Sequence, residues 1–390
     1  MSPPATVVIG NHTQGLGIVR SAAAAGGAVW VVNDKSLSLA RYSRHLTGYR
    51  RIPHGTLLNL SQPKSAAVLR DALLELPLSG MSAIFGVNED VNRFIHQHRK
   101  ELRGRFVIPE VRLETIYDKY VFNTLVPKPA QIDTRLANEV DWTAAAAGNF
   151  LLKGRVGNAF RELTGQKAIC LKDMPSSNRE QLFTQLPADQ VVLQEIIETQ
   201  SPVRSVCSFS VDGQIRAWFG YDKLRQHPNR FGTGTYLGSV AVDELKPVAE
   251  AILQKLNYTG LSEIEFIHEP VTQTYRVIEM NPRAWKSVHF ATQCGQNLVA
   301  LYLKHLAGER VDTGGRYRHG GYWADLATDL PQMLRERKLS GYHRGFFECT
   351  WESSDPLPAL VLWTGFPLIA LENFWAARFG KPGKSDHKRV

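Results

Sequence analysis

The sequence has few cysteines, and their spacing excludes two common ways of stabilising a small domain. Among its 390 residues only four are cysteine, and no two of them form a Cys-x-x-Cys pair. This spacing argues against a structural zinc site and a disulfide framework, and it is typical of a protein in a reducing cytoplasm. The composition, 43% hydrophobic and 21% charged, is that of an ordinary globular chain long enough for two or three domains.

The sequence also lacks a clear targeting or membrane-spanning segment. Residues Met1 to Ala5 carry no charged region and lead directly into a predicted strand, so no signal peptide is expected. The apolar stretch from Leu357 to Phe374 is interrupted by Pro358 and Pro367. It falls short of the about 20 mostly apolar residues that a spanning helix needs. Two interpretations remain open: buried C-terminal packing, which is favoured, and an anchor lying on the membrane surface.

Acidic residues are outnumbered by basic ones, which gives a formal charge of +9 and a pI of about 9.3. Part of this excess lies in the tail from Lys381 to Val390, where a solvated terminus is the simplest interpretation. A positive surface also suits anionic substrates, nucleic acid or an acidic membrane leaflet. The sequence has no zinc finger and no basic array interleaved with aromatic residues, so a nucleic-acid partner is not expected.

The order of predicted elements indicates an α/β chain that opens with a βαβ unit. Thr6–Gly10 and Val29–Asn33 are predicted strands, connected by a glycine-bearing turn at Asn11–Gly17 and a helix over Ile18–Gly26. The glycines do not have the spacing of the G-x-G-x-x-G dinucleotide motif. A later strand and the acidic loop 88–90 that follows it are predicted to face a ligand crevice.

A domain boundary is predicted near Pro109 to Asp118, after which antiparallel strands replace the βαβ pattern. Asp212-Gly213 is a hairpin turn signal between two of these strands. The other predicted elements are strands at Asn149–Lys153 and Val191–Ile197, a helix over Glu244–Leu256 capped by Asp243, and a helix over Asn297–Leu306.

Two carboxylates and an amide oxygen on neighbouring strands are the most informative group in the sequence. One predicted strand carries Glu265, and the next carries Glu279 and Asn281. Because successive side chains alternate between the faces of a strand, Glu279 and Asn281 point the same way. Oxygen ligands of this kind suit Mg²⁺, and the guanidinium of Arg283 suits a phosphate chain. The segment therefore predicts a site for nucleotide chemistry.

Other polar residues lie at the ends of apolar strands, where a nucleotide could be held. Lys153 closes one strand, and it either extends to water or pairs with phosphate at the mouth of a cleft. Gln194 and Glu195 end another strand, whose backbone could contact an adenine edge, although such strand ends are common. Lys223 and Arg225 alternate, so they are predicted to share a strand face and reach phosphate or a substrate carboxylate. An exposed basic hairpin is the alternative for this pair.

In their order and spacing, these residues resemble the ATP-grasp superfamily, and its carboxylate–amine ligases in particular, over residues 5–310. The matching pieces are Asp118-Lys119, Lys153, Gln194-Glu195-Ile196-Ile197, Glu265, Glu279 and Asn281-Pro282-Arg283, together with Tyr42-Ser43-Arg44 near the N-terminus. The resemblance implies an α/β (α+β) fold. A pre-ATP βαβ domain would span residues 1–115, an ATP-grasp domain with antiparallel sheets would span 116–310 and divide near 195, and a C-terminal region would span 311–390.

The resemblance also implies a role for each matching residue. ATP would lie between two subdomains, and two Mg²⁺ ions would bridge its β- and γ-phosphates. The metal ligands would be Glu265, Glu279 and Asn281; the nucleotide contacts Lys119, Lys153, Gln194, Glu195, Ile197 and Glu198; and the catalytic cations Arg283, Lys223 and Arg225.

The implied reaction is ATP-dependent amide or peptide bond formation through an acyl phosphate, with release of ADP and phosphate. Its substrates would be a small carboxylate and a small amine, of amino-acid or amino-sugar type. A homodimer in the cytoplasm is expected, and contact with the inner face of the membrane is left open. Two alternatives remain: bicarbonate activation of the carboxylase type, and a nucleotide-binding regulatory or membrane-associated protein without turnover.

The sequence departs from the family pattern in two places. Lys153 precedes Gly154 instead of the family's usual proline, and Glu263 stands where D-alanine ligases have an arginine. The second departure argues against a D-alanine ligase and leaves Arg283 or Arg225 to supply the positive charge. By position alone, the candidate substrate contacts from the first domain are Arg20, Arg44, Glu89 and Asp90.

Overall fold

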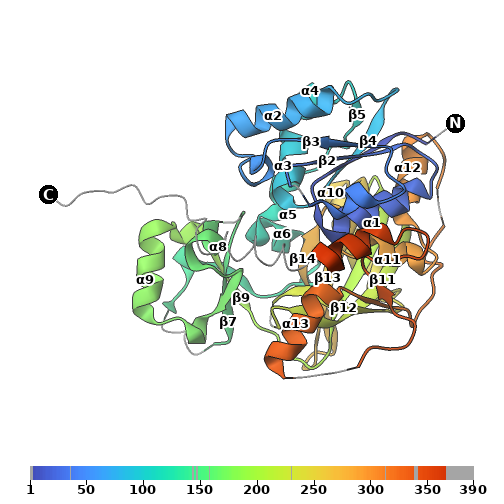
Figure 1. Cartoon of the computed structure of the whole chain (residues 1–390). Helices are drawn as coiled ribbons and strands as arrows, with labels where there is room; N and C mark the ends of the chain where they lie inside the picture. The colour runs from blue at the N-terminus through green and yellow to red at the C-terminus, as the bar shows by residue number, and fades with distance from the viewer. Residues whose placement is uncertain are drawn as a thin grey trace.

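The computed structural model describes residues 3–35, 37–142, 145, 148–157, 159–229, 231–311, 313–337 and 341–365. Its strands form a parallel sheet, a small antiparallel sheet and a large, mainly antiparallel sheet. Figure 1 shows the parallel sheet at the top, the small sheet at the lower left and the large sheet at the lower right. The predicted α/β fold with antiparallel sheets is confirmed.

The parallel sheet contains five strands in the order β3-β2-β1-β4-β5. The hydrophobic side chains of β1 alternate between two cores, because Val7 and Ile9 face one side of the sheet and Val8 faces the other. Helices α2 and α3 cover the first side, and α1 packs on the second. The elements are β1 (Thr6–Ile9), α1 (His12–Ala23), β2 (Val29–Asn33), β3 (Gly48–Arg51), α2 (Pro63–Leu74), β4 (Ser82–Gly86), α3 (Glu89–Gln97), α4 (Arg99–Leu102) and β5 (Phe106–Val107).

Two local predictions in this region are wrong. The segment predicted as a glycine turn already belongs to α1, and Gly15 and Gly17 lie inside the helix. A Cβ on Gly17 would come within 3.2 Å of the Cβ of His289, so this glycine allows α1 to approach α11 closely. The predicted acidic loop is the first turn of α3, where Asn88 accepts a hydrogen bond from the Val91 N–H and caps the helix.

The small sheet has the strand order β6-β9-β7-β8 and its own hydrophobic core. Two short helices, α5 and α6, precede it in the chain, and α8 and α9 cover it. The elements are α5 (Leu113–Tyr117), α6 (Lys119–Leu125), β6 (Thr134–Leu136), β7 (Phe150–Gly154), α8 (Ala159–Thr164), β8 (Ala168–Cys170), α9 (Ser176–Gln185) and β9 (Val191–Glu195).

The large sheet has the strand order β14-β13-β10-β11-β12-β15-β16. The predicted hairpin at Asp212-Gly213 joins β10 to β11, and both turn residues have positive φ angles. Helices α11 and α12 cover one face and α10 covers the other, but α10 begins after Leu245, so Asp243 is not its cap. The elements are β10 (Val203–Val211), β11 (Gln214–His227), β12 (Thr233–Ser239), α10 (Lys246–Leu256), β13 (Gly260–Glu269), β14 (Thr274–Asn281), α11 (Val288–Gln293), α12 (Leu298–Leu306), β15 (Tyr322–Ala324), α13 (Leu326–Glu336) and β16 (Phe347–Glu348).

Residues 349–365, here called the C-terminal strap, follow β16 and return to the parallel sheet domain. The buried Asp355 carboxylate accepts hydrogen bonds from Arg20 Nε at 3.0 Å, Ser43 Oγ at 2.7 Å and the Arg44 N–H at 2.9 Å. Arg20 also donates to the carbonyl of Thr350 at 2.9 Å. Arg20 is therefore used to hold the strap, and its prediction as a substrate contact is wrong.

The strap ends in a helix over residues 357–365, drawn in red beside α1 in Figure 1. Leu362 of this helix packs against Leu16 and Leu39. The rest of the apolar stretch predicted from Leu357 to Phe374, and the basic tail, lie outside the described residues. None of the helices in the described part of the chain combines the length and hydropathy needed to cross a bilayer.

Candidate active site

The two predicted metal carboxylates lie directly opposite each other on adjacent strands. In the antiparallel pair β13 and β14, Glu265 is in register with Glu279, and Glu263 with Asn281. All four side chains project from the same face, because each pair is separated from the next by two positions along both strands. Like charges in directly opposite positions are destabilising, so this pair needs compensating positive charge.

Lysines supply that positive charge. Lys223 Nζ on β11 donates to Glu265 Oε1 at 2.5 Å, and both side chains are about nine-tenths buried. Burial raises the pKa of the Glu265 carboxyl, although Lys223 opposes the shift. Burial alone would also raise the pKa of Glu279, but the surrounding ammonium groups hold that pKa below its ordinary value. These groups belong to Lys223, Lys153, Lys167 and Lys119.

Three of these lysines lie outside the large sheet, and Glu279 in turn influences the pKa values of two of them, Lys153 and Lys119. Lys153 is on β7 of the small sheet, and Lys119 is the first residue of α6. Burial lowers the pKa of Lys153 to about 8, and the charges that act on it are those of Glu279, Lys119 and Glu265. Burial lowers the pKa of Lys119 too, against the opposing effect of Glu279. The structure thus brings three separate parts of the chain to one carboxylate pair.

The predicted adenine segment lies where the chain leaves the small sheet. The Gln194 side chain accepts a hydrogen bond from Lys153 Nζ at 2.7 Å and donates to Thr134 Oγ1 at 3.3 Å. Glu195 ends β9, and its side chain is exposed. Residues 196–202 connect to β10 of the large sheet. Within that connection, Glu198 Oε1 accepts a hydrogen bond from Asn149 Nδ2 at 2.9 Å.

Sequence reasoning missed the groups that orient Asn281. Glu263, which is almost fully buried, accepts hydrogen bonds from the Tyr221 hydroxyl and from Asn281 Nδ2, the latter at 3.0 Å. Because the Asn281 amide donates to Glu263, its oxygen is left as the acceptor, and it receives Arg283 Nη2 at 3.1 Å. The spacing in the sequence could have identified them. Glu263 and Glu265 are two positions apart on one strand and so share a face, and Tyr221 and Lys223 are spaced in the same way on another strand.

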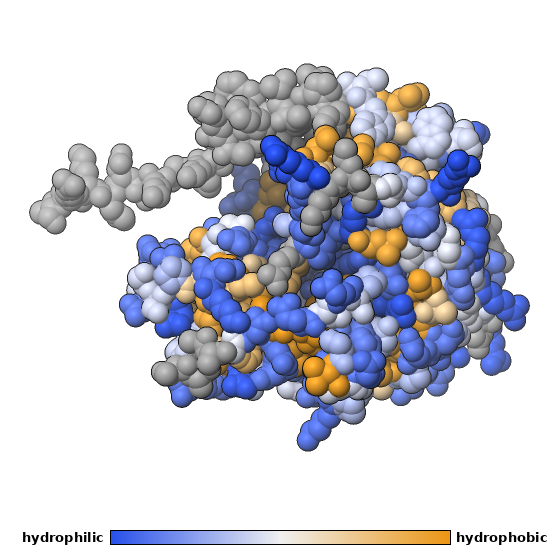
Figure 2. Space-filling model, turned by 90° about the horizontal axis from the view of Figure 1, so that it is seen from below, coloured by the Kyte–Doolittle hydropathy of each residue, from blue (hydrophilic) through white to orange (hydrophobic). Residues whose placement is uncertain are grey.

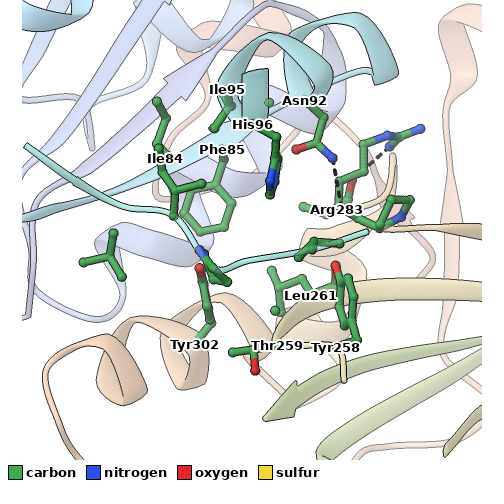
Figure 3. Close-up of a pocket in the computed structure, with 18 residues that line it drawn as sticks. Ile84, Phe85, Asn92, Ile95, His96, Tyr258, Thr259, Leu261, Arg283 and Tyr302 are labelled. Atoms are coloured by element: carbon green, nitrogen blue, oxygen red, sulfur yellow. Dashed lines mark hydrogen bonds between the residues drawn. The ribbon is translucent and has the colours of Figure 1, made fainter. Parts of the chain in front are cut away.

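Side chains of the parallel sheet domain hold the backbone on both sides of Arg283. Asn92 Nδ2 on α3 donates to the carbonyl of Pro282 at 3.1 Å, and Gln14 Nε2 on α1 donates to the carbonyl of Ala284 at 2.6 Å. Figure 3 shows Asn92 pointing to this turn at the edge of a cavity that Arg283 also lines. The other labelled residues are divided equally between apolar side chains and side chains with a polar group, and we assign the cavity no chemistry.

Arg225 lies away from this group, and the prediction that it shares a face with Lys223 is wrong. Lys223 is in register with Leu237 of β12, whereas Arg225 is in register with Tyr236, the adjacent residue. The extra residue between them, Leu224, forms a bulge that turns Arg225 to the opposite face of the sheet. There Arg225 Nη2 donates to the buried Asp329 carboxylate of α13 at 2.6 Å.

The donor set fits a magnesium–phosphate complex better than a metal held by protein alone. Among the residues that the structure describes, no group of three or more His, Cys, Asp or Glu side chains could hold a metal ion. Mg²⁺ is usually bound by one or two carboxylates, with water and substrate phosphates completing its octahedron. Glu265 and Glu279, with the amide oxygen of Asn281, match that requirement, and the lysines match the phosphate oxygens.

Comparisons with known proteins give one family-model match and several similar solved structures. The sequence model of a family described as "Carbamoyl-phosphate synthase L chain, ATP binding domain" matches residues 235–313, which include the carboxylate pair. No curated protein matches the sequence of the chain.

Several solved structures resemble the chain, all at low sequence identity. N5-carboxyaminoimidazole synthetase from Staphylococcus aureus, complexed with ADP, has a TM-score of 0.62 and 15% identity over 86% of this chain and 85% of its own. Biotin carboxylase from Campylobacter jejuni has a TM-score of 0.61 and 15% identity over 81% and 74%. L-amino acid ligase from Bacillus licheniformis has a TM-score of 0.55 and 15% identity over 78% and 74%. At this identity the similarity shows the shared fold.

Proposed function

Because the chain has the ATP-grasp fold, we propose that it is an ATP-dependent carboxylate–amine ligase that forms an amide or peptide bond. The observation that carries the proposal is the pair Glu265 and Glu279, facing each other beneath lysines from three separate parts of the chain. A protein that only bound nucleotide would not need two opposed carboxylates, whose like charges destabilise the fold unless cations compensate them.

The proposed nucleotide lies between the small and large sheets. Lys119 and Lys153 contact its phosphates, and Gln194 turns from Lys153 to the adenine amino group. The other proposed nucleotide contacts are the backbone of Glu195 and Ile197, and the carboxylate of Glu198 for the ribose. Magnesium held by Glu265, Glu279 and Asn281 would neutralise the phosphate chain, which lets a carboxylate approach the γ-phosphoryl group. We propose two ions.

The remaining cations are assigned to the reacting groups. Arg283 stabilises negative charge on the transferred phosphoryl group or on the tetrahedral intermediate formed when the amine attacks the acyl phosphate. Lys223, released from Glu265 when that carboxylate binds metal, faces the same phosphate. Arg225 is left out of the catalytic set because its guanidinium binds Asp329 on the other face.

A second candidate reaction is activation of bicarbonate as the carboxylate. It is favoured by the similarity to N5-carboxyaminoimidazole synthetase and to biotin carboxylase, which have higher TM-scores than the amino acid ligase. The two reactions share the acyl-phosphate step and differ in the carboxylate that enters. We also propose a cytoplasmic location and a homodimer, since the structurally similar biotin carboxylase domain of the Hydrogenobacter thermophilus 2-oxoglutarate carboxylase is a dimer.

The test is phosphate release from Mg-ATP by the full chain, measured across pairs of small carboxylates and amines and with bicarbonate. Release that requires both a carboxylate and an amine supports the ligase. Release that requires bicarbonate instead would move the assignment to the carboxylase type. Tight ATP binding without release for any pair would contradict turnover and favour a regulatory role.

Lys223→Met is expected to lower kcat by about a hundredfold, because it removes a cation aimed at developing charge. Arg225→Met, on the same strand, is expected to change kcat by less than about tenfold, because its contacts with Asp329 and with the rings of Tyr236 and Tyr342 lie on the other face of the sheet. Steady-state phosphate release measures both effects, and the thermal midpoint of each variant separates them from unfolding. An equal loss of kcat in the two folded variants would contradict the assignment of Lys223 and Arg225 to opposite faces of the sheet.

A further inference from the structure

A group of basic side chains lies at the edge of the candidate active site, outside the set assigned to ATP. It consists of Lys286, His12 and Lys35 and is here called the cationic cluster. Lys286 comes three residues after Arg283, His12 is the first residue of α1, and Lys35 follows the carboxyl end of β2. Two of its members therefore lie where open α/β sheets bind their ligands, at the carboxyl ends of parallel strands.

Hydrogen bonds between distant segments hold the cluster together. The Asn11 side chain accepts a hydrogen bond from the Leu39 N–H at 3.2 Å, which ties the segment after β2 to the start of α1. Gln14 in the first turn of α1 donates to the carbonyl of Ala284, two residues before Lys286. Figure 1 shows α1 beside α11, the helix that follows this turn. The basic side chains thus come from segments that are fixed against one another.

The cluster carries more positive charge than its neighbours cancel. Lys286 Nζ lies 2.6 Å from the Asp325 carboxylate, whereas Lys35 forms no ion pair with any residue that the structure describes. Glu348, on the strand beside Asp325, is occupied by two N–H groups of the strap. Burial and the ammonium groups of Lys35 and Lys286 lower the pKa of His12, although Asp325 opposes the shift. Positive charge therefore remains in excess.

Hydrogen-bond donors in the cluster remain available to a ligand. An ammonium has three N–H groups, and Asp325 takes one of those of Lys286. The carbonyl of Gly234 is 3.5 Å from Lys286 Nζ, so it takes little of the remaining capacity. The Asn11 side chain does not cap α1, and Thr13 Oγ1 in the first turn is buried without a partner among the described residues. The positive end of this helix adds to the attraction for an anion.

The cluster is next to the carboxylate pair. Gly234 of β12 lies between two lysines, because its carbonyl faces Lys286 and a Cβ on it would be 3.5 Å from Cγ of Lys223. Lys223 in turn pairs with Glu265. A small molecule bound at Lys286 therefore lies beside the position assigned to the reacting phosphate.

We propose that the cationic cluster binds a second acidic group of the carboxylate substrate, either another carboxylate or a phosphate, while the first carboxylate meets ATP. This inference rests on the proposed function and names the class of its substrate, a small molecule with at least two acidic groups. Lys286 contacts the second acidic group, and Asp325 orients the ammonium of Lys286. His12 and Lys35 complete the positive surroundings.

The surface and the cluster both favour a small ligand over a macromolecule. On the face of the molecule seen in Figure 2, hydrophobic residues are dispersed among hydrophilic ones. Dispersed apolar groups are normal on a protein surface and mark no docking site. In the cluster, the side chains of Lys286 and Asp325 are 26% and 6% exposed, so a ligand has to enter a partly closed site to reach them.

Binding of matched pairs of small acids to the full chain tests the proposal. Succinate, aspartate and phosphoserine each carry one more acidic group than butyrate, alanine and serine, respectively. Calorimetric titration in the presence of Mg-ADP measures the affinity of each probe. At least one doubly acidic probe is expected to bind about tenfold more tightly than its partner, as for one charge-assisted contact. Preference for succinate or aspartate assigns a carboxylate, and preference for phosphoserine assigns a phosphate.

Lys286→Gln is expected to weaken binding of the preferred probe about tenfold and to leave its singly acidic partner within about twofold. Lys35→Gln, which breaks no ion pair, should weaken the same probe about threefold. Lys246→Gln is the matched control, because Lys246 also pairs with a carboxylate, Glu250 at 3.1 Å, and is 25% exposed, but lies on α10 across the large sheet. It should bind every probe as the unaltered chain does, and thermal midpoints show which variants are folded.

Equal binding of both members of every pair overturns the proposal, as does a preference that folded Lys286→Gln and Lys35→Gln both retain. The titration needs no turnover, so it is separate from the test of the ligase. Preferred binding of a doubly acidic probe without phosphate release from Mg-ATP would contradict the proposed reaction and support the anion site. Release with singly acidic substrates, without any binding preference, would contradict the anion site and support the ligase.

Discussion

Replacing Glu279 with glutamine is expected to reduce ATP-dependent turnover by at least about a thousandfold, because one proposed metal ligand loses its charge without a change in volume. Glu279 is the carboxylate that all four surrounding lysines stabilise in its charged form, and it stands opposite Glu265. The fold should survive, because the substitution removes a like-charge contact between the two facing carboxylates. Phosphate release at saturating Mg-ATP measures the effect, and the urea midpoint reports on the fold.

Glu269→Gln is the matched control for this experiment. Glu269 lies on the same strand pair as the proposed metal carboxylates, but it pairs with Arg276 near the turn that joins β13 to β14. We expect its variant to keep turnover within about threefold of the parent protein, as for a change outside a reactive group. If Glu279→Gln retained near-normal turnover, the assignment of Glu279 as a magnesium ligand would be wrong.

Asp355→Asn is expected to lower the free energy of unfolding by about 3 kcal/mol, because it leaves the buried Arg20 guanidinium without its main counter-charge. Arg20 and Asp355 are each 1% exposed at their side chains, so water cannot replace the lost interaction. Glu352 lies 3.2 Å from Arg20 and is 31% exposed, so it offers weaker compensation. Urea unfolding at neutral pH measures the change.

Asp71→Asn provides the comparison on the surface. Asp71 also pairs with an arginine, Arg70 at 2.8 Å, but its side chain is 55% exposed. Its substitution should change stability by less than about 1 kcal/mol. The double variant Arg20→Met with Asp355→Leu should recover part of the free energy of unfolding lost in Asp355→Asn. Apolar residues of similar volume can replace a buried ion pair without leaving an uncompensated charge. Equal effects of Asp355→Asn and Asp71→Asn would contradict a structural role for the strap contact.

Local pattern was enough to predict much of the fold and the centre of the candidate site. Strand β1 was predicted from its apolar run, and the hairpin was predicted from Asp212-Gly213, because these signals depend on residues near each other in sequence. The pairing of Glu265 with Glu279 follows for the same reason, since β13 and β14 are joined by a short turn. The alternation of side chains along β14 then places Asn281 on the same face as Glu279.

Predictions from local sequence pattern were wrong where one extra residue changes the register of a strand, or where contacts join segments that are distant in the sequence. The bulge at Leu224 reversed the direction of Arg225, although the alternation of Lys223 and Arg225 predicted a common face. The turn predicted before α1 was wrong, because Gly17 allows close packing of α1 against α11, a helix that comes more than 250 residues later in the chain. Nor could local pattern identify Asn92 and Gln14, which hold the turn around Arg283 from another domain.

The sequence by itself determined the chemistry that the site can carry: two carboxylates, an amide and a set of cations at strand ends, in an order typical of the ATP-grasp superfamily. Only the tertiary structure decided which cations meet the carboxylates. Lys119, Lys153 and Lys223 come from a helix and two different sheets, and their convergence on Glu279 depends on how these elements pack. Side-chain direction repeats locally along a strand, whereas the distance between sheets is set by the whole core.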